Sequence, residues 1–103
     1  MLLKLMVLDK NVTTQESNKN DSYNVIQKKL EEEYKELSEA IVEDDDIHIA
    51  EEVFDLIQVC IRVLVVLAKK GFNLEQLCNK HNKKLVKRGW IHSNIVRIWF
   101  KRN

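Results

Sequence analysis

The 103-residue sequence contains no proline and only two glycines, Gly71 and Gly89. Because these residue types interrupt helices most often, their scarcity favours long helices. Gly71 suits the left-handed position at which a helix ends, and Gly89 closes a later helix. The two cysteines, Cys60 and Cys78, are too few for a disulfide framework and lack zinc-ligand spacing. Cys60 falls on an apolar helix face and is predicted to be buried.

An excess of charge of one sign and a long hydrophobic run are also missing. Seventeen basic and sixteen acidic residues give a net charge of +1, which suggests neither a nucleic-acid coat nor a membrane-surface protein. The longest mostly apolar stretch, residues 56–68, is shorter than the ~20 residues that a membrane span requires. Residues 1–8 are too short for a signal peptide. We therefore expect a cytoplasmic protein with no nucleic-acid partner and no membrane partner.

The pattern of apolar residues predicts an all-α fold. One domain over residues 1–103 fits the chain length, with a helical core of about 22–90. A first helix is expected from about Ser22 to Val42 and a second from about Ile47 to Lys70, so the chain would fold back at residues 43–46 into a helical hairpin.

A third helix follows in the predicted order. Asn73 can cap it, with Gln76 completing a capping box, and Gly89 ends it. The apolar segment 1–8 fits a short strand or a docking segment, and residues 91–103 fit either a strand or a helix.

The second predicted helix is apolar on two faces. One face carries Val53, Leu56, Ile57, Cys60, Leu64 and Leu67, and the other carries Val59, Val63 and Val66. A single hairpin partner cannot cover both faces, and a helix of this kind is normally buried in a larger bundle. In so small a chain this predicts a homodimer or homotetramer built as a four-helix-bundle type of oligomer.

Two acidic pairs are the most informative motif. Glu33 and Glu36 lie on the first predicted helix, and Glu52 and Asp55 lie on the second. Residues three apart share one helix face. Glu33 and Asp55 are equally distant from Asp44, as are Glu36 and Glu52, so an antiparallel hairpin would bring all four carboxylates to one height on the seam.

The helical pattern also indicates that these carboxylates point inward. Glu33 falls inside the apolar stripe of the first helix and Glu36 lies at its edge, while Glu52 and Asp55 begin an apolar face of the second. A carboxylate aimed into an apolar seam is costly unless it is protonated, hydrogen-bonded or bound to a cation. Mg²⁺ or Mn²⁺ is the simplest compensation. The alternatives are a solvated acidic face and a buried network with nearby Lys or Arg.

These residues resemble a known signature. The run from Glu32 to Glu36, followed by Glu52 and Asp55, is similar to the E-E-x-x-E…E-x-x-D motif of the MazG-like all-α nucleoside triphosphate pyrophosphohydrolases. Residues 82–88 resemble the family's N-x-K-[FL]-x-x-R segment, so the likeness spans about 22–90. It implies Mg²⁺-dependent hydrolysis between the α- and β-phosphates of an NTP or dNTP, giving a monophosphate and pyrophosphate.

The resemblance also implies roles for individual residues. The metal ligands, which are also catalytic residues, would be Glu33, Glu36, Glu52 and Asp55. Glu32 would act as a base or position a water, unless it is simply exposed. The substrate-binding residues would be Asn82, Lys84 and Arg88, although a solvated basic helix end fits the same residues. His48, His81, His92, Trp90 and Trp99 are predicted to have surface or packing roles.

Three alternatives differ from this interpretation. The first is a related helical enzyme that hydrolyses phosphoribosyl-ATP. The second is a non-catalytic helical module that oligomerises and binds metal only structurally. The third is a nucleic-acid binder that uses the basic C-terminal third, which the acidic first half makes less favourable. The sequence pattern leaves the base and the sugar of the substrate undetermined.

Overall fold

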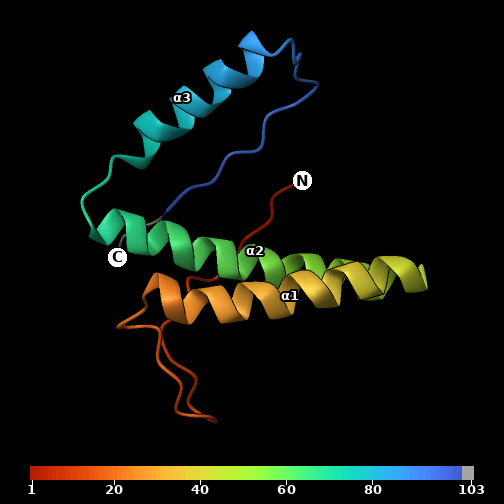
Figure 1. The fold of residues 1–103 in the computed structure, drawn as a ribbon, viewed down its shortest axis with the longest axis vertical. Helices are drawn as coiled ribbons and strands as arrows, with labels where there is room; N and C mark the ends of the chain where they lie inside the picture. The colour runs from red at the N-terminus through yellow and green to blue at the C-terminus, as the bar shows by residue number, and fades with distance from the viewer. Residues whose placement is uncertain (101–103) are drawn as a thin grey trace. The chain divides into compact units, whose positions relative to one another are not determined.

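The computed structural model describes residues 1–100 and shows three helices and no strand in that range. These are α1 (Tyr23–Glu43), α2 (Asp46–Lys69) and α3 (Leu74–Lys87) (Figure 1). The predicted all-α fold class is therefore confirmed. By its internal contacts the chain divides into two compact units, one of residues Met1–Phe72 and one that begins at Asn73.

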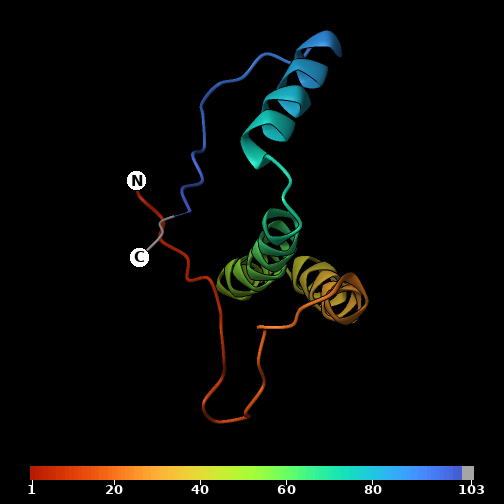
Figure 2. The same cartoon turned by 90° about the vertical axis from the view of Figure 1, so that its left-hand side faces the viewer.

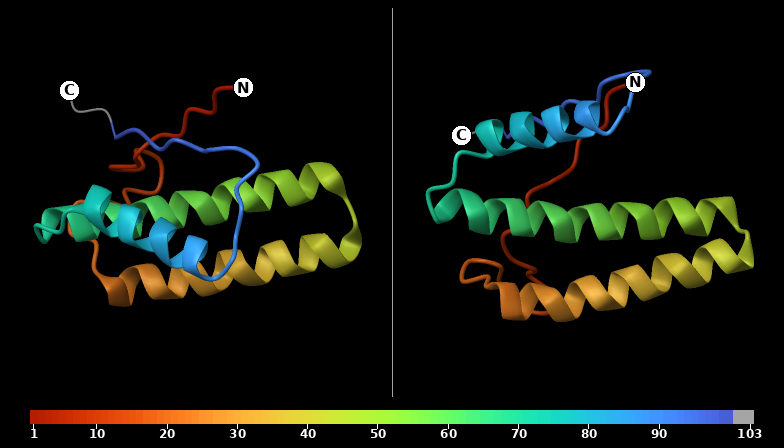
Figure 3. Two further views of the ribbon diagram at one scale, coloured as in Figure 1. Left: turned by 90° about the horizontal axis from the view of Figure 1, so that it is seen from above. Right: turned by 45° about the horizontal axis from the view of Figure 1, so that its top comes forward.

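Helices α1 and α2 form an antiparallel hairpin (Figure 3). Ser22 caps α1, because its side chain accepts a hydrogen bond from the backbone N–H of Val25. The chain reverses at Asp44, whose φ of 58° is left-handed, a conformation that aspartate tolerates better than most residues. Asp45 then caps α2 by accepting from the N–H groups of Ile47 and His48. The fold-back predicted at residues 43–46 is confirmed.

A narrow seam holds the hairpin together. On α1 the buried residues are Ile26, Glu33 and Ala40, which are spaced seven apart and so lie along one line of the helix. Val59 and Val66 of α2 are buried in the same way and form the core with Ile26. Burial of such apolar side chains supplies the main favourable term in folding. Along α1 the seam is therefore apolar at Ile26, acidic at Glu33 and apolar again at Ala40, next to the turn.

Residues 1–8 form no strand, which was one of the two structures expected for them. Residues 1–22 form a long loop that passes beside α2 and returns to the start of α1 (Figure 2), with an isolated antiparallel bridge between Lys10 and Ser17. Asn18 closes the loop by donating its side-chain amide to the carbonyl of Leu8 at 3.2 Å. Apolar and polar residues do not alternate regularly in residues 1–8, and no neighbouring strand within residues 1–100 supplies ladder hydrogen bonds. These two facts explain why the segment is not a strand.

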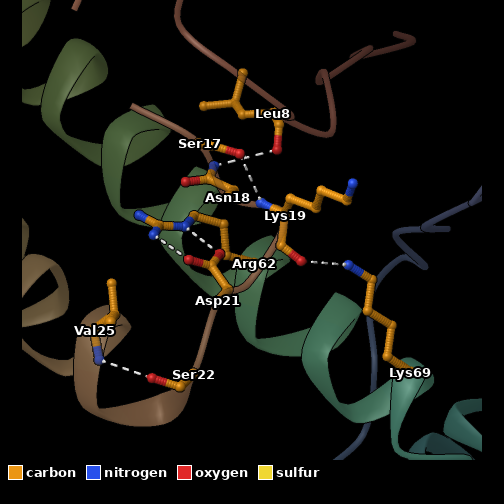
Figure 4. A network of polar contacts seen from close by, with 9 residues as sticks. All are labelled: Leu8, Ser17, Asn18, Lys19, Asp21, Ser22, Val25, Arg62 and Lys69. Atoms are coloured by element: carbon orange, nitrogen blue, oxygen red, sulfur yellow. Dashed lines mark hydrogen bonds and ion pairs between the residues drawn. The ribbon is translucent and has the colours of Figure 1, made fainter. Parts of the chain in front are cut away.

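An ion pair attaches this loop to α2 (Figure 4). The guanidinium of Arg62 donates two hydrogen bonds of 2.8 Å to the carboxylate of Asp21. Their side chains are only 15% and 9% exposed. The hydrogen bond with Asp21 is also the main reason why the pKa of Arg62 lies above its usual value. A bidentate, mostly desolvated pair of this kind fixes both partners in one geometry.

Helices α2 and α3 end in the same way. The N–H of Gly71 donates to Ala68, and the N–H of Phe72 donates to Leu67, which is the Schellman arrangement. Gly71 has a φ of 90° and Gly89 a φ of 91°, so both predicted helix ends are confirmed. Asn73 caps α3 by accepting from the N–H of Gln76. Residues 91–100 form neither the strand nor the helix that was expected for residues 91–103. Residues 101–103 lie outside the described residues.

The prediction that Cys60 is buried was wrong. Its side chain is exposed, because α1 covers only the face of α2 that carries Val59 and Val66. Phe54 and Ile57 on α2 are also exposed, by 39% and 36%. Among residues 1–100, no helix is both long enough and apolar enough to cross a membrane.

Candidate metal centre

Four carboxylates converge on the seam of the hairpin. Glu33 and Glu36 from α1 and Glu52 and Asp55 from α2 each offer an oxygen, and these four oxygens all lie within 4.8 Å of one another. The convergence expected from the two mirrored pairs is therefore present. Their roles as ligands and catalytic residues stay predictions.

The four side chains differ in depth. Glu33 is 5% exposed, because it occupies the same helix line as two buried apolar residues of α1. The side chain of Glu52 is 12% exposed, while Glu36 and Asp55 are exposed. The cluster therefore has one buried carboxylate on α1, one half-buried carboxylate on α2, and an exposed pair through which a ligand can enter.

Lys29 partly compensates the buried charge of Glu33. Its ammonium lies 3.1 Å from Glu33 Oε1 and 3.4 Å from Glu32 Oε2. The hydrogen bond with Glu33 is the largest cause of the raised pKa of Lys29. Glu32, whose side chain is 62% exposed, thus contacts Lys29 and is not one of the four convergent carboxylates. Sequence reasoning had considered a Lys or Arg network without identifying this lysine, although its i,i+4 spacing to Glu33 was a readable signal.

His48 lies at the edge of the cluster and was expected to have only a surface or packing role. Its Nε2 is 3.3 Å from Glu52 Oε1, and its Nδ1 is 3.1 Å from Glu43 Oε2. The hydrogen bond to Glu43 is the main reason why the pKa of His48 is raised. His48 therefore orients the half-buried carboxylate of Glu52. The i,i+4 spacing to Glu52 could have signalled this contact.

Two oxygens of the cluster have no hydrogen-bond partner among residues 1–100. Glu33 Oε2 and Glu52 Oε2 are buried and accept no hydrogen bond from the described part of the chain. An unsatisfied buried acceptor costs about 1–3 kcal/mol, and more when it is charged. A divalent cation prefers carboxylate oxygens and would satisfy both atoms. The donor set therefore fits a hard divalent metal ion.

A pocket of about 260 Å³ adjoins the cluster. Its walls are formed by Leu8, Lys29, Glu33, Asp55, Gln58, Val59 and Arg62. A ligand held by the carboxylates therefore has space to extend along α2, away from the turn of the hairpin.

The three predicted substrate-binding residues belong to the second compact unit. Asn82 and Lys84 lie on α3, and Arg88 is its C-terminal cap residue. All three are exposed, as is required of residues that bind a ligand. Their contact with substrate stays a prediction.

The hairpin with its acidic cluster defines an all-α protein that could bind a divalent metal. The sequence profile of the family described as phosphoribosyl-ATP pyrophosphohydrolase matches residues 2–84, which is more than half of the chain. The chain belongs to this family, a branch of the MazG-like all-α superfamily that the sequence motif indicated. Membership indicates a hydrolase with pyrophosphohydrolase activity. Comparisons with curated proteins and with solved structures gave no match.

Proposed function

We propose that the protein is a Mg²⁺-dependent pyrophosphohydrolase that cleaves an NTP or dNTP between the α- and β-phosphates. The products would be a nucleoside monophosphate and pyrophosphate. The observation that carries the proposal is the pair of buried, unpartnered oxygens of Glu33 and Glu52 inside a cluster of four carboxylates. In a member of a pyrophosphohydrolase family, such a cluster is suited to a metal that also binds phosphate.

Each part of the cluster has a distinct task in this proposal. Glu33, Glu36, Glu52 and Asp55 hold the metal, and Mn²⁺ is a suitable substitute for Mg²⁺. When bound, the ion supplies charge neutralisation for the phosphates and acidifies a water for attack on phosphorus. Lys29 lies in the adjoining pocket, where its ammonium can attract a phosphate oxygen. Glu32 contacts the same ammonium and can accept a proton from a nearby water.

The basic end of α3 is the proposed source of further phosphate contacts. Lys84 lies in the last turn of α3 and Arg88 directly follows it. Guanidinium and ammonium groups bind phosphate oxygens through charge-assisted hydrogen bonds. Asn82 lies at a different angle around the helix, so it would bind another part of the substrate or support the helix itself.

The family match favours a second candidate substrate, phosphoribosyl-ATP. This compound is ATP with an added phosphoribosyl group, so it offers the same bond between its α- and β-phosphates. The same four carboxylates would serve either substrate. The two candidates differ only in what the protein must accept around the base.

We also propose that the protein works as a homodimer or homotetramer. The support is the apolar face of α2 that α1 does not cover, which includes Phe54, Ile57 and Cys60. Contiguous exposed apolar surface is a feature of association sites. A second copy with the same face would bury these residues and produce a four-helix bundle.

The test is a pyrophosphate-release screen across NTPs, dNTPs and phosphoribosyl-ATP with Mg²⁺ or Mn²⁺. Glu36→Gln, Glu52→Gln and Asp55→Asn should each reduce turnover by ~10²-fold or more, the range seen when a preorganised electrostatic group is lost. The matched control is Glu39→Gln, which removes an exposed carboxylate of α1 that lies outside the cluster. Metal binding without turnover of any substrate would favour the non-catalytic module instead.

A further inference from the structure

The second compact unit carries a large excess of positive charge. From Asn73 to the end of the sequence there are eight basic residues and one acidic residue, Glu75, which gives a net charge of +7 with histidine neutral. Residues 1–72 therefore have a net charge of −6. The expectation of no membrane partner used the net charge of the whole chain, which conceals this division. Because salt limits the reach of a charge to about 8 Å, a surface responds to the residues that approach it.

The segment that follows α3 exposes apolar side chains. Residues 91–100 form no helix or strand (Figure 1). The exposed fractions are 91% for Ile91, 64% for Ile95, 90% for Val96, 69% for Ile98, 87% for Trp99 and 42% for Phe100. Single exposed apolar residues are normal, whereas a continuous group of them marks a site of interaction. Six such residues within ten positions therefore require a partner.

Basic residues accompany these apolar side chains. Arg97 lies within the segment, and Lys101 and Arg102 follow it directly in the sequence. Four lysines of α3 recur three or four positions apart and so share one helix face, namely Lys80, Lys83, Lys84 and Lys87. The unit thus combines exposed apolar side chains with many cations, which suits a partner that has both negative charge and an apolar interior.

The apolar composition favours a lipid bilayer over a nucleic acid. Aliphatic side chains have no flat face on which a base can stack, but they gain free energy when they leave water. Four of the six exposed side chains are aliphatic, those of Ile91, Ile95, Val96 and Ile98. Tryptophan and phenylalanine are common at the boundary between lipid headgroups and acyl chains, and neighbouring basic residues reach the lipid phosphates. An irregular segment also suits a fluid surface, which requires no fixed arrangement of side chains.

We propose that residues 91–100, with the basic residues around them, attach the protein reversibly to membranes that contain anionic lipids. The apolar side chains enter the boundary between headgroups and acyl chains, and the cations attract the negative lipid surface. The segment lies on the membrane, because ten residues are fewer than the ~20 that a span requires. This role is separate from the proposed function and uses no residue of the acidic cluster.

Tryptophan fluorescence can follow this segment directly. The chain has two tryptophans, Trp90 and Trp99, and both belong to the second unit. The full-length protein would be titrated with vesicles of phosphatidylcholine alone and with vesicles that also contain phosphatidylglycerol. Emission spectra report the environment of the tryptophans, and flotation of the vesicles measures the bound fraction.

Two substitutions separate the apolar and the electrostatic contributions. Ile98→Ala shortens an exposed aliphatic side chain of the segment, and Arg97→Gln removes a positive charge next to it. The matched controls lie on α1. Val42→Ala shortens an aliphatic side chain that is 86% exposed, and Lys35→Gln removes the charge of an exposed lysine.

The wild type should bind the vesicles with phosphatidylglycerol at low salt, and its emission should shift to shorter wavelength. Binding should be much weaker to phosphatidylcholine alone and at high salt. Ile98→Ala should weaken binding by about tenfold, because less apolar surface leaves water. Arg97→Gln should weaken it by about fivefold, the contribution of one basic residue near an anionic membrane. Both control variants should bind as the wild type does.

Several results would overturn the membrane role. The wild type could fail to bind vesicles with phosphatidylglycerol, or Ile98→Ala could bind them as well as the wild type, which would leave only diffuse charge attraction. An emission shift with single-stranded oligonucleotides and none with vesicles would assign the segment to a nucleic acid. A shift that depends only on protein concentration would assign it to a second copy of the chain.

Discussion

Replacing Glu33 by glutamine should stabilise the metal-free protein while removing most of its response to Mg²⁺. Glu33 and Glu52 are the least exposed members of the cluster, with carboxylate oxygens no more than 4.8 Å apart. At an effective dielectric constant of ~20, two charges at this distance repel by about 3.5 kcal/mol. Glu33→Gln removes this repulsion.

The substitution also weakens the ion pair with Lys29, whose side chain is 48% exposed. Exposed ion pairs contribute about 0–1 kcal/mol. Solvent screens the repulsion between the carboxylates, and the lost ion pair with Lys29 offsets part of what is left. We therefore expect Glu33→Gln to be more stable than the wild type by about 1–3 kcal/mol in EDTA. For a chain of this length that corresponds to a rise in Tm of roughly 4–12 °C.

Adding metal should cancel most or all of this difference. A ligand present at one hundred times its Kd stabilises the folded state by about 2.7 kcal/mol, so the wild type should gain roughly 10 °C in Tm. Glu33→Gln should gain much less, because one buried charged ligand is missing. Thermal melts followed by circular dichroism, at one protein concentration, in EDTA and then in Mg²⁺, measure both effects.

Glu39→Gln is the control for this comparison, since it removes one carboxylate from an exposed position of α1. It should change Tm little in either condition. The reasoning would be refuted if Glu33→Gln lowered Tm in EDTA and kept the full response to Mg²⁺. That result would mean that Lys29 already neutralises the cluster and that the unpartnered oxygens do not bind metal.

Three further predictions follow from other parts of the chain. Asp21→Asn leaves Arg62 unpaired and should lower the free energy of unfolding by about 2–3 kcal/mol in urea titrations, whereas adding Arg62→Met should recover part of the loss. Lys84→Ala should reduce kcat/KM by an amount equivalent to about 1.5–3 kcal/mol, and Lys83→Ala should have little effect; equal small losses would indicate only a diffuse field. Light scattering should show an oligomer for the wild type and a smaller species for Ile57→Glu, and a stable, active wild-type monomer would contradict the proposed association.

The helices and their ends could be predicted because the signals are local. Ser22, Asp45 and Asn73 cap helices through hydrogen bonds within three residues, and Gly71 and Gly89 adopt the left-handed conformation that ends a helix. Such interactions depend on sequence neighbours alone. The acidic cluster could be predicted for the same reason. The helical period and a two-residue turn determine which side chains of the two helices lie at the same height along the hairpin.

Only the tertiary structure decided which faces and atoms are covered. Periodicity places Cys60 on an apolar face, but whether that face is buried depends on how far α1 extends around α2. The partnership of Asp21 with Arg62 joins residues far apart in the sequence, and the unmet buried oxygens of Glu33 and Glu52 appear only when their surroundings are known. Sequence patterns specify the direction of a side chain from its own helix, whereas burial and hydrogen-bond satisfaction depend on what the rest of the chain places in front of it.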